Sequence, residues 1–184
     1  MIDWSPGIGD PDPISWFIVF FYIVTSFLTF TAGMFRAQRD DRQLKARWFW
    51  FIATFILLLL AVNKQLDIQT LFAEVGRFLA NHYGFYEKRR VVQTVFVLLV
   101  VCTSLTFLIF LSILLKGAHH TVKLAHFGLI VIVAFIIIRA SSFHQVDAYL
   151  GLEFLNVRVN WLIEIAGIFI VAISAATYTF QAKR

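Results

Sequence analysis

The residues best suited to chemistry lie in the segment 139–147, which reads Arg-Ala-Ser-Ser-Phe-His-Gln-Val-Asp. This segment directly follows a fifteen-residue, almost wholly apolar run from Leu124 to Ile138. Fifteen helical residues rise only about 22 Å, whereas the hydrocarbon core of a bilayer is about 30 Å thick. We therefore expect the helix to continue into the polar residues. A cation, two hydroxyls, an imidazole and a carboxylate would then lie at or just inside one membrane face.

Two other predicted helices carry polar residues at the same depth. A fifteen-residue apolar stretch that begins at Trp48 is followed by Asn63 and Lys64, and the last predicted helix begins at the same face with Glu164 in its first turns. Ionisable residues inside a membrane usually face the bundle and pair with one another. We expect Lys64 to pair with Asp67 or Glu164, and Arg139 to pair with Asp147 or Glu164. The predicted shared site consists of Asn63, Lys64, Asp67, Arg139, Ser142, His144, Asp147, Asn160 and Glu164.

Three kinds of function fit such a cluster. It could bind a polar or anionic ligand, such as a lipid headgroup or a small solute, with the Arg139 guanidinium gripping a carboxylate or phosphate and Lys64 as a second charge. It could hold a divalent metal for a membrane-embedded hydrolase, because imidazole and carboxylates are common metal ligands. It could also be structural, with ion pairs that hold together a subunit or assembly partner of a larger membrane complex. The candidate metal ligands are His144, Asp147, Asp67 and Glu164.

Two further forms of chemistry are disfavoured by geometry. Haem is an improbable cofactor because His126 and His144 lie on one predicted helix, about 27 Å apart along its axis, and cannot clamp one haem. A nucleophile, base and orienting acid formed by Ser141, His144 and Asp147 is disfavoured because side chains one turn apart on a helix rarely align for proton transfer. The sequence alone does not identify the ligand.

The composition predicts the fold class. The 184 residues are 60% hydrophobic and 15% charged, whereas soluble domains are about 45–50% apolar and about 25% charged. We predict a single all-α membrane domain over residues 1–184, a polytopic bundle of five transmembrane helices plus one interfacial amphipathic helix after the second. The predicted spans are about 14–35, 48–66, 91–115, 122–147 and 161–180, and the interfacial helix is about 67–83.

The basic residues indicate the membrane as the partner. The net charge is +5, but the cations lie between the apolar stretches, where they set topology and contact anionic headgroups. No basic face or aromatic reader of nucleic acid is evident. Five cations in the connection 36–47 favour a cytoplasmic location, so we expect the N-terminus outside and the C-terminus in the cytoplasm. The short connections suggest a bacterial inner membrane.

Three features of the apolar stretches predict packing. Thr25, Thr29 and Gly33 recur every four residues, a spacing that usually marks a helix-packing seam. The single cysteine, Cys102, lies inside an apolar stretch and is expected to be a small core residue. Trp48 and Trp50 are expected to be anchors at the membrane interface.

Overall fold

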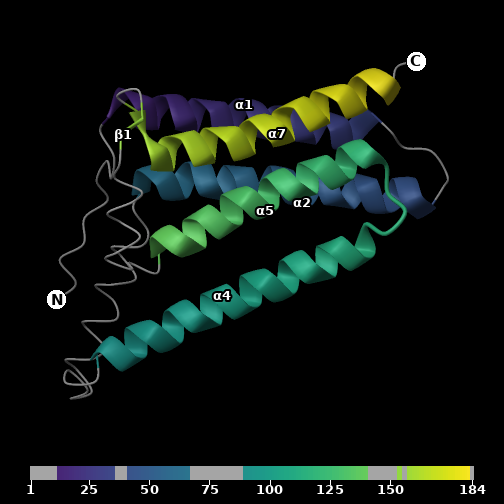
Figure 1. Cartoon of the computed structure of the whole chain (residues 1–184). Coiled ribbons are helices and arrows are strands. Elements are labelled where there is room, and N and C mark those ends of the chain that lie inside the picture. Colours follow the sequence, from purple (N-terminus) through teal and green to yellow (C-terminus); the bar gives the residue numbers. More distant parts are fainter. Residues whose placement is uncertain (1–11, 36–40, 67–88, 141–152, 155–156, 183–184) are drawn as a thin grey trace.

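Five helices make up almost all of the described part of the chain in the computed structural model (Figure 1). The structure describes residues 12–35, 41–66, 89–140, 153–154 and 157–182. A two-stranded antiparallel hairpin is the one departure from the all-α prediction within these ranges, and it pairs Glu153 with Arg158. The elements in chain order are α1 (Pro13–Phe35), α2 (Asp41–Leu66), α4 (Arg89–Leu114), α5 (His120–Ala140), β1 (Glu153–Phe154), β2 (Val157–Arg158) and α7 (Val159–Ala182).

Three of the helices are long and apolar enough to cross a membrane, namely 13–34 of α1, 44–66 of α2 and 161–181 of α7. α4 and α5 contain shorter apolar stretches, 101–114 and 120–136. The all-α prediction is thus confirmed for the described residues, and the three candidate spans support the predicted membrane protein. Two of the five predicted crossings rest on the shorter stretches. The predicted interfacial helix at 67–83 lies outside the described residues.

The helix boundaries differ from the prediction in two places. The second span is predicted at 48–66, after the charged connection 36–47, but α2 already begins at Asp41. The fifth span is predicted at 161–180, but α7 already begins at Val159, and the hairpin directly precedes it. Apolar patterning locates the membrane-crossing part of a helix, whereas the helix itself continues into polar residues because its backbone hydrogen bonds do not depend on hydrophobicity.

Four helices form the packed bundle. α1 lies against α2 and α7, and α7 also lies against α5. α4 contacts α5, and Figure 1 shows that these two helices converge at the turn that joins them and diverge toward their other ends. The turn contains Gly117, whose φ of 82° is in the left-handed region that favours glycine at a helix C-terminus.

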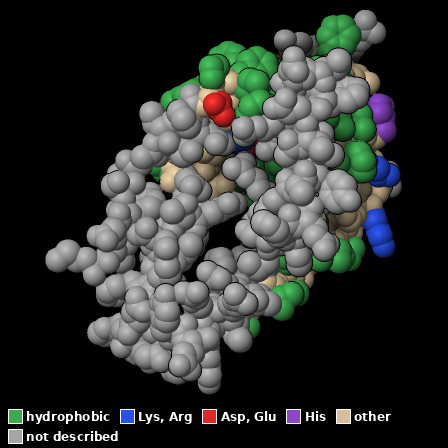
Figure 2. Space-filling view, turned by 60° about the vertical axis from the view of Figure 1, so that its left-hand side comes forward, with side chains coloured by type: hydrophobic (Ala, Val, Ile, Leu, Met, Phe, Trp, Pro, Cys, Tyr) green, Lys and Arg blue, Asp and Glu red, His purple; other side chains and the backbone are tan. Residues whose placement is uncertain are grey.

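The bundle is apolar both inside and outside. Its core includes the fully buried side chains of Phe49, Leu57, Ile132, Ile168 and Val171. Large apolar side chains such as Phe27 (66% exposed) and Phe55 (63% exposed) point outward. Figure 2 shows that hydrophobic side chains make up most of the coloured surface on one face, whereas Lys, Arg and His side chains gather at one edge. Such a surface would be unfavourable in water, so it fits contact with lipid.

A close helix crossing joins α5 to α7 through two glycines. A Cβ atom at Gly128 would lie 2.8 Å from Val171 Cγ2 and 3.0 Å from the carbonyl oxygen of Gly167. A Cβ atom at Gly167 would lie 2.6 Å from Ile132 Cγ1. Small residues permit such close approach in membrane helices, where packing replaces the hydrophobic drive for association. This crossing fixes the position of α7, which carries Glu164.

The predicted small-residue seam on α1 is confirmed. Thr25 and Thr29 are fully buried, and Thr29 Oγ1 lies 2.9 Å from Thr54 Oγ1 of α2. A Cβ atom at Gly33 would lie 3.1 Å from the Phe51 ring. The seam therefore packs α1 against α2, the helix that carries Lys64.

Two expectations about single residues are wrong. Trp50 is fully buried rather than interfacial, because it faces the bundle, with its ring centroid 5.2 Å from that of Tyr178. Trp48, two residues earlier, is on the exposed side. Cys102 is exposed rather than in the core, whereas the buried side chains of α4, Leu108 and Leu111, lie closer to its C-terminal end.

Candidate functional site

Three helices bring charged and hydroxyl-bearing side chains to one end of the bundle. Lys64 lies two residues before the end of α2, and Glu164 lies in the second turn of α7. The C-terminal end of α2, the start of α7 and the start of α1 all lie at the same end (Figure 1). Because α1 packs against both other helices, a residue on its inner face can reach the pair. Tyr22 is that residue.

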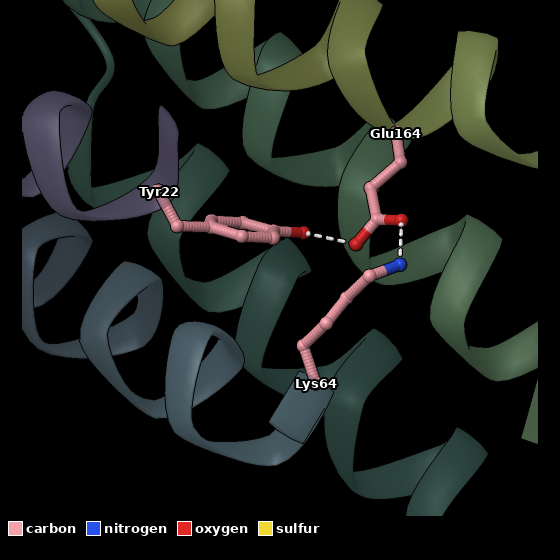
Figure 3. A network of polar contacts seen from close by, with 3 residues as sticks. All are labelled: Tyr22, Lys64 and Glu164. Atoms are coloured by element: carbon pink, nitrogen blue, oxygen red, sulfur yellow. Dashed lines mark hydrogen bonds and ion pairs between the residues drawn. The ribbon is translucent and has the colours of Figure 1, made fainter. Parts of the chain in front are cut away.

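The three side chains form one hydrogen-bonded cluster, shown in Figure 3. Lys64 Nζ donates to Glu164 Oε2 at 2.7 Å, and the Tyr22 hydroxyl donates to Glu164 Oε1 at 3.0 Å. Both oxygens of the carboxylate thus accept a hydrogen bond from a different helix. The prediction that Lys64 pairs with Asp67 or Glu164 is confirmed for Glu164.

The cluster is almost completely excluded from solvent. The side chains of Lys64 and Glu164 are each 4% exposed, and Tyr22 is fully buried. Removing two ions from water costs several kcal/mol per ion, and their attraction offsets this only when the geometry is good and other polar atoms are satisfied. Here the short contact and the tyrosine hydroxyl meet both conditions for Glu164. One ammonium and one carboxylate give the cluster a net charge of zero.

The structure describes less about the other predicted site residues. Asn63 adjoins Lys64 on α2 and is partly buried. Arg139 lies in the last turn of α5, and Asn160 lies in the first turn of α7. Both helix ends are at the same end of the bundle as Lys64 (Figure 1), as the depth argument predicted for the backbone. The predicted residues outside the described part of the chain are Asp67, Ser142, His144 and Asp147.

The metal-binding hypothesis stays a prediction. Within the described ranges, no three His, Cys, Asp or Glu residues come together in a way that could hold a metal ion. Of the four candidate ligands, Glu164 is the one that these ranges include, and both of its oxygens already accept hydrogen bonds. The other three are among the residues that the structure does not describe.

Tyr22 is a member of the cluster that the sequence reasoning missed. The available signal was helical spacing, because Tyr22 precedes Thr25 by three residues and Thr29 by seven. Residues at these spacings share one face of a helix. The same seam that predicted the packing of α1 therefore also predicts that Tyr22 faces the interior.

A second buried polar contact lies near the other end of the bundle. His126 of α5 is 6% exposed, and its Nε2 lies 2.7 Å from Ser112 Oγ of α4. The Ser112 hydroxyl also donates to the carbonyl of Leu108 at 2.9 Å, so His126 Nε2 is then the donor to Ser112. Nδ1 of His126 has no hydrogen-bond partner. This contact links α4 to α5 close to the turn that connects them.

No protein-family model matches the chain, and no significant similarity to a curated protein or a solved structure is found. What the chain does must therefore be inferred from its own residues and contacts.

Proposed function

We propose that this chain is a small integral membrane protein that binds a polar or anionic group at Lys64. The ligand would be an oxyanion, either the phosphodiester of a lipid headgroup or the acidic group of a small solute. The observation that carries this proposal is the Lys64–Glu164 ion pair, whose side chains are each 4% exposed within a bundle of apolar helices.

Stability alone is a weak reason for such a pair. Well-packed apolar residues of similar volume often replace a buried ion pair with no loss, or with a gain of about 1–4 kcal/mol. Ionisable residues inside membrane helices are costly and usually mark a ligand, ion or proton site. The pair therefore supports a functional role more strongly than a purely stabilising one.

An anion would bind by taking the place of the Glu164 carboxylate as the partner of Lys64. The ammonium is a compact charge on a flexible stem with three donors, so it can turn from one oxyanion to another. The Tyr22 hydroxyl, which donates to Glu164 Oε1 at 3.0 Å, would stay with that carboxyl group. Arg139, at the same end of the bundle by its backbone position, is proposed as a further cation for the ligand.

The test compares anion binding by the wild type, Glu164→Gln and Lys64→Gln. Two probes carry the same phosphodiester chemistry: soluble dimethyl phosphate, and phosphatidylglycerol in nanodiscs otherwise made of phosphatidylcholine. If Glu164 competes with the anion for Lys64, Glu164→Gln should bind at least about tenfold more tightly, equivalent to about 1.4 kcal/mol. Lys64→Gln should lose binding. Tighter binding to one probe alone would identify the ligand as lipid or solute.

A matched control is Ser174→Ala. Ser174 is buried on α7, ten residues after Glu164, and its hydroxyl donates to Ile170 of its own helix. This variant should bind both probes as the wild type does. Equal, weak binding by the wild type, Glu164→Gln and Lys64→Gln would contradict the proposal.

A structural or assembly role in a larger membrane complex is the second candidate. The observation that favours this role is that both carboxylate oxygens of Glu164 already accept hydrogen bonds, one from α1 and one from α2, which joins these helices to α7. Buried polar groups can specify a unique arrangement of helices. For this role we expect Glu164→Gln to loosen the bundle without any gain in anion affinity.

We also propose an orientation. The cations of the connection 36–47 would lie in the cytoplasm, which places the Lys64–Glu164 end of the bundle at the outer face, in a bacterial inner membrane. Cysteine-accessibility labelling at the two ends of the chain would test this orientation.

A further inference from the structure

We infer that the site couples each anion it binds to the uptake of one proton by Glu164. This inference rests on the proposed function and adds a second ligand, the proton, to the same site. It follows from the charge and burial of the cluster. The cluster now holds one ammonium and one carboxylate, and both are 4% exposed.

An incoming anion would upset this balance. With the Glu164 carboxylate still charged, the site would hold two negative groups and one positive group. A net charge that water cannot reach is costly, and proteins usually avoid it by neutralising the group. Two anions that compete for one ammonium would also repel each other at close range. A proton on the carboxylate removes both costs at once.

Among the side chains that the structure describes, Lys64 is the cation in contact with Glu164. Arg139 lies at the same end of the bundle by its backbone position, and if it took part in anion binding it would replace the proton, an outcome that the experiment below distinguishes. The titratable groups that face Glu164 are Tyr22 from α1 and Lys64 from α2. α5 packs on α7 at Gly128 and Ile132, neither of which carries a charge. A neutral tyrosine cannot balance a second anion, and Lys64 is already counted.

The exchange is balanced in atoms and charge. The hydrogen bond from Lys64 Nζ to Glu164 Oε2 breaks, and a new one forms from Lys64 Nζ to an oxygen of the anion. A proton from water goes to the freed Oε2, which becomes a hydroxyl. The Tyr22 hydroxyl continues to donate to Oε1. The product is one ammonium, one bound anion and one neutral carboxylic acid, again with a net charge of zero.

The experiment measures the affinity of the full chain in nanodiscs for dimethyl phosphate and for phosphatidylglycerol as a function of pH. Both phosphodiesters keep their charge across the neutral range, so changes report on the protein. In the wild type, anion binding requires the uptake of one proton, so the affinity should fall about tenfold for each unit rise in pH. Titration calorimetry in two buffers with different heats of ionisation should count about one proton for each anion.

The matched variants separate this inference from the proposed function. Glu164→Gln should bind the anion with no dependence on pH, because a neutral side chain already balances the site. Tyr22→Phe provides a second variant in case Glu164→Gln does not fold. This variant keeps the Glu164 carboxylate, so the change of affinity with pH and the number of protons taken up for each anion should stay at the wild-type values.

Two results would overturn one claim or both. Wild-type binding that is strong but independent of pH would overturn the proton coupling and leave anion binding intact, with compensation by another cation such as Arg139. Absence of binding to either probe in the wild type, Glu164→Gln and Tyr22→Phe would overturn the proposed function, and the coupling with it.

Discussion

The ion pair between Lys64 and Glu164 predicts strong thermodynamic coupling between these two positions. At 2.7 Å and an effective dielectric constant of about 20, the attraction is about 6 kcal/mol before the cost of desolvation. Removal of one member leaves an uncompensated buried charge, which costs about 3–5 kcal/mol. We therefore expect Lys64→Met and Glu164→Gln each to lower the free energy of unfolding by about that amount.

The double variant should lose much less than the sum. Methionine fills a similar volume to lysine without a charge, and glutamine still offers an oxygen to the Tyr22 hydroxyl. The remaining loss should be of the size seen for isosteric core changes, below about 1.5 kcal/mol. The coupling energy between the two positions should accordingly reach at least about 4.5 kcal/mol, above the range of about 0.5–3 kcal/mol for ordinary residues in contact, because each single variant leaves a buried charge without its partner.

The assay is reversible unfolding in mixed detergent micelles, followed by tryptophan fluorescence. The buried Trp50 supplies a signal that changes when the bundle opens. Ser174→Ala combined with Lys64→Met is the control pair, and its effects should add. Additive effects of Lys64→Met and Glu164→Gln, with a coupling below about 0.5 kcal/mol, would refute the view that the charges are paired and buried.

Three other perturbations test the packing around the site. Gly128→Ala should destabilise the bundle by about 1–3 kcal/mol through overpacking, because the new Cβ would lie 3.0 Å from the Gly167 carbonyl oxygen. This loss should outweigh the better helix propensity of alanine. Unfolding of the variant at the same denaturant concentration as the wild type would contradict this prediction. Thr54→Val removes one interhelical hydrogen bond to Thr29 and should cost only about 0.6 kcal/mol, measured in the same assay. A spin label at Cys102, which is exposed on α4, should be more accessible to oxygen than to a polar nickel chelate, whereas the reverse order would place that stretch in water.

The sequence by itself determined that the described part of the chain is mainly helical and where the apolar parts of these helices lie. A long apolar run inside lipid must form a helix, because every backbone polar group there has to be hydrogen-bonded. A helix makes these hydrogen bonds within the segment itself, so the requirement does not depend on other parts of the chain. The direction of successive helices then fixed which ends meet. For that reason the depth argument placed Lys64 and Glu164 at one end of the bundle, where they form an ion pair.

The sequence could not specify which face of each helix points inward. α2 and α4 are apolar on several sides, so hydrophobicity does not distinguish a lipid-facing residue from a core residue. Trp50 is therefore buried although it resembles an interfacial anchor, and Cys102 is exposed although it resembles a core residue. The composition of α4 and α5 also does not indicate that these two helices contact each other along only part of their length.

Only the tertiary structure decided which of several candidate partners Lys64 takes. Along the chain, Asp67 is three residues from Lys64, whereas Glu164 is one hundred residues away. The close crossing of α5 and α7 at Gly128 and Gly167, together with the packing of α1 against α2 and α7, brings Glu164 to the lysine and Tyr22 to Glu164. Such a contact depends on how helices pack against each other, and the small residues Gly128 and Gly167, which are not members of the cluster, contribute to that packing.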